Sequence, residues 1–299
     1  MIKITTFLII SLIFVSCTTI QPPHEPVEIR PVKIKPTPPL VTQLPTYLLS
    51  LRNKPAVPGG IAWIAIPKQN NLPPVITYKN KRVVVLRNRQ QWVALVGIAL
   101  AAKIGRHTLI NQTTKQQYSF LVINKKYKVQ RLTIKNKRKV TPIPSDIQRI
   151  NREKNSMRYA LASAWRPTTT SPLPLMLPIR GRLSSPFGTK RYLNGKRRNS
   201  HTGLDIAAPL GTHIGSAGDG KIVNVGDYFF TGKTVIIDHG QGVVTLYGHM
   251  NTIKVFLGQI IQTGEIIGTV GKTGRATGPH LHWSVSLNQN MIDPTLIMK

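Results

Sequence analysis

The segment 280–287 (HLHWSVSL) alternates strictly between polar and apolar side chains. Alternate side chains of a β-strand point to opposite faces of the sheet, so this pattern predicts a strand with one apolar and one polar face. The apolar face is expected to pack in a core. The polar face carries two imidazoles, His280 and His282, followed by Ser284 and Ser286. This face either lines a groove or is an ordinary solvated sheet face, and the strand alone leaves both open.

Short apolar runs punctuated by glycine recur through residues 179–299 and predict a compact all-β domain of hairpins, similar to a barrel-sandwich. None of its segments has the pattern of a helix. The alternation in 243–247 continues to His249, which is expected on the same face as Tyr247 and at the end of its strand. The expected strands are 221–225, 234–239, 243–247, 266–270 and 280–287.

Residues 51–135 predict a separate N-terminal β domain. Short segments rich in β-branched and aromatic residues are separated by turn signals, which is typical of a small β-sandwich. Nothing in it suggests chemistry, so we interpret it as an accessory module for spacing or for binding envelope proteins. The expected strands are 61–67, 74–78, 82–86, 92–100, 107–111 and 118–123.

One helix is expected to connect the two β domains, within residues 136–178. Ser145 and Gln148 have the spacing of a capping box at its start. Apolar residues recur at helical spacing through 145–165 and predict an amphipathic connector. A proline-rich linker follows over 166–178. The apolar positions are Ile147, Ile150, Met157, Leu161 and Ala164.

The charge of the chain is strongly unbalanced, with 41 Lys+Arg against 10 Asp+Glu in 299 residues and a net charge of +31. Such a surface associates with polyanions, and nucleic acid is the first candidate. Residues 1–16 argue against it, because a lysine followed by a nine-residue apolar run predicts an export signal too short to span a bilayer. Anionic cell-wall or lipid surfaces are then the expected partners. The alternative is that the positive charge only reflects a basic proteome and indicates no particular partner.

The export signal ends at Ser16-Cys17 and resembles a bacterial lipoprotein signal, in which Cys17 becomes the lipidated first residue. An ordinary secretory signal with an incidental cysteine is the alternative. Thr18 and Thr19 offer no aspartate for inner-membrane retention, so the resemblance favours the outer membrane. A proline-dense tether over 17–50 would hold a periplasm-facing domain away from the membrane.

Two short clusters of metal-binding side chains lie about eighty residues apart. His201 and Asp205 form the first, and His280 and His282 the second. Together they offer two neutral imidazoles and one carboxylate for one Zn²⁺, with an imidazole left over beside an open coordination position. This composition is typical of a hydrolytic zinc site, whereas a structural site is usually closed by four ligands.

Residues 184–294 resemble the M23 zinc endopeptidases that cut peptidoglycan peptides, the lysostaphin-like group. The resemblance implies that His201, Asp205 and His282 bind zinc and that His249 and His280 are catalytic. It also implies cleavage of stem-peptide cross-links, in an exported protein the bond between D-alanine and diaminopimelate. The matching pieces are SSPFG (184–188), HTGLDIAAPLGT (201–212), YFFTGKTVIIDHGQG (228–242), LYGHM (246–250) and GKTGRATGPHLHWSV (271–285).

Three other functions compete with this interpretation. A catalytically silent wall-binding protein that activates an amidase would be expected to lack a ligand, and all are present. A carrier domain fits the hairpins around 257–270 but has no use for the histidines. A nucleic-acid binder rests on charge alone, because no known binding motif is visible.

Overall fold

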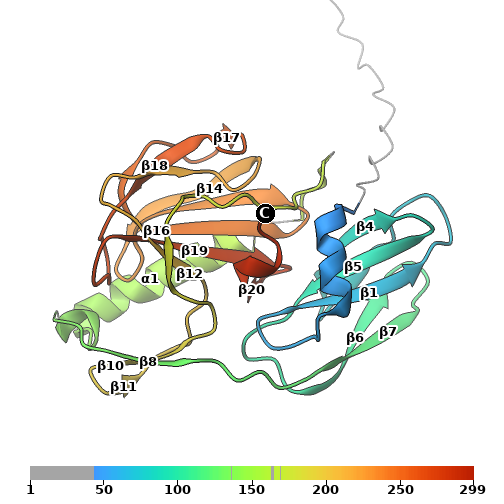
Figure 1. Ribbon diagram of the computed structural model, residues 1–299, viewed down its shortest axis with the longest axis horizontal. Coiled ribbons are helices and arrows are strands. Elements are labelled where there is room, and N and C mark those ends of the chain that lie inside the picture. Colours follow the sequence, from blue (N-terminus) through green and yellow to red (C-terminus); the bar gives the residue numbers. More distant parts are fainter. Residues whose placement is uncertain (1–43, 136, 163–164, 169) are drawn as a thin grey trace, which may run out of the picture. The chain divides into compact units, whose positions relative to one another are not determined.

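The computed structural model describes residues 44–299 except 136, 163–164 and 169 (Figure 1). The expected signal peptide, Cys17 and the tether up to residue 43 lie outside this described part. The chain is mainly β, as its alternation predicts. The described part begins with a short 3-10 helix, η1 (Thr46–Asn53), and contains no helix both long and apolar enough to cross a bilayer.

The predicted N-terminal β-sandwich is confirmed, because two small sheets enclose one core. Trp92, Ala94 and Val96 of the central strand β5 face side chains of the other sheet in this core. One sheet contains β1 (Ile61–Pro67), β5 (Gln91–Gly97) and β4 (Val84–Asn88), and the other β3 (Lys81–Arg82), β2 (Ile76–Tyr78), β6 (Gly105–Asn111) and β7 (Gln117–Val122).

Strand β5 is buried on both faces. Its other side chains, Val93 and Leu95, belong to the core cluster of the C-terminal sheet, which also contains Trp283. At the end of β5, the backbone N–H of Gly97 donates to Oδ1 of Asn288 at 2.6 Å, and Asn288 Nδ2 donates back to the Gly97 carbonyl at 3.1 Å. The sandwich and the C-terminal sheet are therefore joined by a shared apolar core and a buried reciprocal amide contact.

Residues 129–197 contribute a small sheet that the sequence does not reveal. Strand β8 (Val129–Leu132) pairs in parallel with β10 (Lys190–Leu193), which also pairs with β11 (Lys196–Arg197). A short 3-10 helix, η2 (Lys137–Lys139), follows β8.

The connecting helix is confirmed as α1 (Pro144–Leu161), but its predicted cap is wrong. The helix begins at Pro144, and the carboxylate of Asp146 accepts the backbone N–H of Ile143 at 3.3 Å. Ser145 therefore lies inside the first turn instead of capping it. The predicted apolar face is also only half used. Met157 and Leu161 pack over the C-terminal sheet, whereas Ile147 is 48% exposed.

The C-terminal domain is built on a ten-stranded, largely antiparallel sheet, and the five predicted strands are all present in it. Leu173 and Leu175, in the segment expected as a linker, are buried in its core. The sheet order is β17 (Ile260–Ile261), β14 (Gly220–Tyr228), β15 (Gly232–Gly240), β16 (Val243–Ile253), β19 (His280–Leu287), β12 (Leu204–Ala207) and β9 (Arg182–Ser185), with β13 (His213–Gly215), β18 (Ile266–Val270) and β20 (Asn290–Ile292) paired beside it and a 3-10 helix, η3 (Pro294–Leu296), after it.

A buried polar chain crosses the core of this domain. The ring of His239 lies between the carbonyl oxygen of Asp219 at 2.8 Å and Oγ1 of Thr245 at 2.7 Å. Thr245 in turn contacts the hydroxyl of Tyr247 at 3.1 Å. A neutral imidazole satisfies both neighbours, donating from Nδ1 and accepting at Nε2. Burial lowers the pKa of His239 to about 4.

This pKa makes His239 an acid-sensitive element of the fold. The unfolded chain takes up a proton near pH 6.5 while the folded chain does not, so stability is lost as pH falls from about 6.5 to about 4. The loss reaches about 3 kcal/mol at pH 4. We expect His239→Gln to be less stable at pH 7 but to show a flatter decline of Tm between pH 6.5 and 4, measured by thermal unfolding.

The exposed His213 provides the matched control. His213→Gln should keep the wild-type dependence of Tm on pH. Equal slopes for His239→Gln and the wild type would contradict this assignment.

Candidate metal centre

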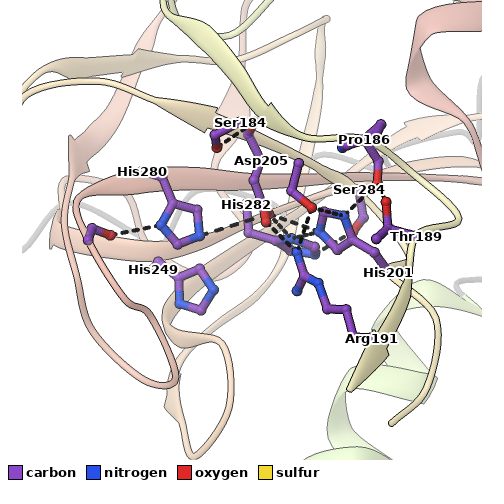
Figure 2. Close-up of polar contacts among 12 residues, drawn as sticks. Ser184, Pro186, Thr189, Arg191, His201, Asp205, His249, His280, His282 and Ser284 are labelled. Atoms are coloured by element: carbon purple, nitrogen blue, oxygen red, sulfur yellow. Dashed lines mark hydrogen bonds and ion pairs between the residues drawn. The ribbon is translucent and has the colours of Figure 1, made fainter. Parts of the chain in front are cut away.

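Three of the predicted site residues meet at one buried point (Figure 2). Antiparallel pairing of β12 with β19 sets Asp205 directly opposite His282. His201 lies four residues before Asp205, in the loop that leads into β12. Oδ1 of Asp205 lies 2.8 Å from Nδ1 of His282 and 2.9 Å from Nε2 of His201, and the two nitrogens are 3.0 Å apart.

Gly203 allows this loop to lie against β19. A Cβ at this position would stand 2.5 Å from Oγ of Ser284 and 2.7 Å from the ring of His282. Any larger residue would therefore push the loop, and His201 with it, away from the strand. The glycine is required by close approach, since its own backbone is not in the left-handed region.

In each of His201 and His282, one ring nitrogen faces Asp205 and the other is hydrogen-bonded to a neighbouring group on the far side. The far hydrogen bond influences which nitrogen of the ring carries the proton. His201 Nδ1 meets the carbonyl oxygen of Pro186 at 3.0 Å, which requires an N–H there and leaves a lone pair on Nε2. His282 Nε2 meets Oγ of Ser284 at 2.9 Å. This hydroxyl can donate or accept, so Nδ1 of His282 can carry either a lone pair or the proton that it shares with Asp205. The His201 lone pair, the Asp205 oxygen and His282 Nδ1 thus lie close together, which is stable only with a proton or a cation among them. Ring nitrogens held by outer partners are typical of metal ligands, so the site fits a divalent ion.

The second oxygen of the Asp205 carboxylate is held by a cation. Arg191 donates from Nη2 to Oδ2 at 2.5 Å and to Oγ of Ser185 at 3.0 Å. Burial alone would raise the pKa of Asp205, but its contacts with His201 and His282 outweigh burial and hold the pKa below its ordinary value. Asp205 is therefore a carboxylate whose Oδ1 faces the candidate metal position. Sequence reasoning did not single out Arg191, although it follows the SSPFG piece by three residues.

His249 reaches the site through a β-bulge. Strand β16 places Gly248 and His249 opposite the single Thr234 of β15, and His249 adopts a left-handed φ of 61°. The extra residue turns His249 away from the core, where Tyr247 packs, toward His282, whose ring centroid is 6.0 Å away. The expectation that His249 shares a face with Tyr247 is therefore wrong.

His249 and His280 lie side by side next to Asp205 (Figure 2), with ring centroids 4.7 Å apart. The carbonyl of Thr273 accepts from Nδ1 of His249 at 2.8 Å, and that of Gly278 accepts from Nδ1 of His280 at 2.8 Å. Both rings thus keep Nε2 as a free acceptor, and Nε2 of His280 is 3.8 Å from Oδ1 of Asp205. Burial, followed by the nearby imidazoles, lowers the pKa of His249 to about 3.

The polar face of β19 lines grooves and is not a solvated face. Ser284 and Ser286 are only 2% and 1% exposed. A cavity of about 1,020 Å³ separates them from helix α1. A second cleft of about 290 Å³ opens over Asp205, His249 and His280, with Arg182, Arg191 and Arg275 among its walls. This cleft therefore connects Asp205, His249 and His280 with the surface.

Comparison with known proteins agrees with this geometry. Residues 199–294 match the model of peptidase family M23, and residues 53–125 match that of the M23 N-terminal domain. A crystal structure assigned to peptidase M23 from Pseudomonas aeruginosa is 39% identical, with a TM-score of 0.69 over 84% of this chain and 98% of that one.

Two curated relatives match part of the chain. The DD-carboxypeptidase/endopeptidase Mpg of Neisseria meningitidis is 40% identical over 39% of this chain and 27% of its own length. The peptidoglycan DD-endopeptidase ShyA of Vibrio cholerae is 41% identical over 35% of this chain and 24% of its own length. The chain thus spans about a quarter of these relatives. The matches across both β domains show that the chain belongs to peptidase family M23.

Proposed function

We propose that this protein is a zinc-dependent endopeptidase that hydrolyses the peptide cross-links of peptidoglycan, at the bond between D-alanine and diaminopimelate. The convergence of His201 Nε2, Asp205 Oδ1 and His282 Nδ1 beside two further imidazoles is the observation that carries the proposal. The peptidoglycan endopeptidases among its relatives support the choice of substrate.

The three converging atoms would hold the metal, and His249 and His280 would move protons. A bound Zn²⁺ supplies Lewis-acid activation of a water molecule and polarisation of the scissile carbonyl. With Nδ1–H fixed by a carbonyl, each of His249 and His280 presents Nε2 to accept a proton from water. The ring that has taken up this proton then donates it from Nε2 to the leaving amine. Either histidine can be the base in this arrangement.

The cell envelope is the proposed location. The substrate lies there, and the net charge of +31 favours binding to an anionic sacculus. We further propose that lipid attached to Cys17 anchors the chain to the outer membrane, and that the N-terminal sandwich binds envelope proteins. These last proposals rest on the sequence alone.

Removal of metal should abolish activity. We expect purified protein to release cross-link cleavage products from sacculi, identified by mass spectrometry, and a chelator to stop the release until Zn²⁺ is restored. His282→Ala should bind no zinc and release nothing, because one of three ligands is lost. Undiminished cleavage by fully chelated protein would rule out the metal mechanism. Zinc binding without any cleavage would favour the silent amidase activator.

Substitution of the two proton-transfer histidines should separate chemistry from metal binding. His249→Ala and His280→Ala are each expected to lower kcat by about 10²- to 10⁴-fold, because general acid–base catalysis contributes that much. Both variants should retain wild-type zinc content, unlike His282→Ala. Metal analysis and steady-state kinetics on a soluble cross-linked peptide test this. Wild-type kcat in either variant would remove that residue from the mechanism.

If Cys17 is lipidated, the mature protein should have a characteristic mass and should fractionate with the membrane. Intact-mass analysis should show loss of residues 1–16 and a mass increase for diacylglycerol and an amide-linked acyl chain. Cys17→Ser should lose this increase and move the protein from the membrane fraction to the soluble periplasm. An unmodified cysteine in the mature chain would favour the ordinary secretory signal.

A further inference from the structure

Arg275 lies in the loop that orients both proton-transfer histidines. Thr273 and Gly278, whose carbonyls accept from His249 and His280, stand at the two ends of this loop, and Arg275 lies between them. Its side chain lines the same cleft as His249 and His280. The position of this guanidinium is therefore coupled to the catalytic rings by a few residues of backbone.

The loop is held rigidly on its inner side. The backbone N–H of Arg275 donates to the Phe230 carbonyl at 2.8 Å, and its guanidinium lies 4.4 Å from the centre of the Phe230 ring. A Cβ on Gly274 would stand 2.4 Å from the backbone nitrogen of Gly232, and Gly274 has a left-handed φ of 70°. These contacts fix Arg275 in the cleft wall instead of leaving it free in solvent.

The charge of Arg275 is not compensated by any carboxylate in the part of the chain that the structure describes. Within the described residues its guanidinium makes no hydrogen bond and no ion pair with a carboxylate, whereas Arg191 is paired with Asp205. Burial, and then the charges of Arg191 and Arg198, lower the pKa of Arg275 to about 10, so it remains a cation at neutral pH. A partly buried cation beside other cations is costly unless an anion binds there.

We propose that Arg275 is a specificity-determining residue that binds a carboxylate on the carbon bearing the leaving amine. This inference rests on the proposed function and names the substrate group that the cleft selects. In a D-alanine–diaminopimelate cross-link the scissile nitrogen is attached to a carbon with a free carboxylate. The histidine that protonates this nitrogen is held by the Arg275 loop and lines the same cleft as Arg275, so we expect the guanidinium to meet the carboxylate on the adjacent carbon.

Candidate substrates differ in the group on the carbon that bears the scissile nitrogen. A terminal D-alanyl-D-alanine bond has a carboxylate at the same place, so it is expected to share this contact. A lysine cross-link has a methylene there, and an amidated diaminopimelate has a neutral carboxamide. Guanidinium and carboxylate form charge-assisted, often bidentate hydrogen bonds, which neither of the last two groups can replace.

Kinetics on matched peptide dimers test this. For the wild type we expect kcat/KM about 10- to 100-fold higher for the diaminopimelate dimer than for its carboxamide or for the lysine dimer, the range of a hydrogen bond between charged groups. Arg275→Gln should lose this preference by slowing the acid substrate alone. Lys272→Gln removes an exposed charge three residues away and should keep the preference.

A binding measurement that needs no turnover complements the kinetics. The released tripeptide ending in diaminopimelate should bind the wild type more tightly than its carboxamide by calorimetry, and Arg275→Gln should bind both equally. Because the acid–amide comparison is made on the wild type, it stands even if Arg275→Gln does not fold.

Equal cleavage of the diaminopimelate dimer and its carboxamide would overturn the role of Arg275 but leave the endopeptidase proposal intact. Absence of cleavage of every dimer would instead refute the proposed function.

A pentapeptide ending in D-alanyl-D-alanine distinguishes the two carboxylate sources. Loss of its cleavage in Arg275→Gln, in parallel with the cross-link, supports one shared contact. If Arg275→Gln affected only the pentapeptide, the proposed contact with the cross-link would be wrong.

Discussion

The antiparallel pairing of β12 with β19 is the constraint on which the candidate site depends. It sets Asp205 opposite His282, and the loop before β12 returns His201 to the same point. Residues 77 positions apart in the chain therefore meet through backbone hydrogen bonds, and the apolar face of β19 anchors this register in the core. A slip of one residue would exchange imidazoles for Leu281 and Trp283, so the packing of the core and the assembly of the site enforce each other.

The N-terminal sandwich is part of the same physical unit as the sheet that carries the site. Val93 and Leu95 of β5 share a core cluster with the apolar residues of β19, and Asn288, directly after β19, exchanges hydrogen bonds with Gly97. Strand β19, which carries His280 and His282 at its start, is therefore stabilised at its other end by the N-terminal sheets. This arrangement gives the M23 N-terminal domain a structural role in addition to any partner that it binds.

The sequence predicted those features that depend on local periodicity. The alternation in 280–287 gave both faces of β19. Two polar clusters at short spacing offered four candidate metal ligands, and the family resemblance selected His201, Asp205 and His282 among them. It could not predict the bulge that turns His249 into the site, because a single inserted residue leaves no periodic signal. Strand β8 (VQRL) was missed since its pairing with β10 depends on a partner about sixty residues away. Arg191 and Arg275 looked like two of many surface cations, and only their contacts distinguish them.

The scarcity of acidic residues explains how the cleft keeps a cationic character. Four of the ten, Asp146, Glu153, Asp205 and Asp238, are paired with arginines. Because Arg191 already neutralises Asp205, the carboxylate that faces the metal position does not repel an incoming anion. Among the residues that the structure describes, no carboxylate pairs with Arg275, so an anionic substrate would meet its guanidinium without an internal competitor. In the proposed function the charge of the chain would therefore act at two ranges. The large net positive charge would favour association with an anionic sacculus, and the restrained guanidinium of Arg275 would recognise a single carboxylate next to the scissile bond.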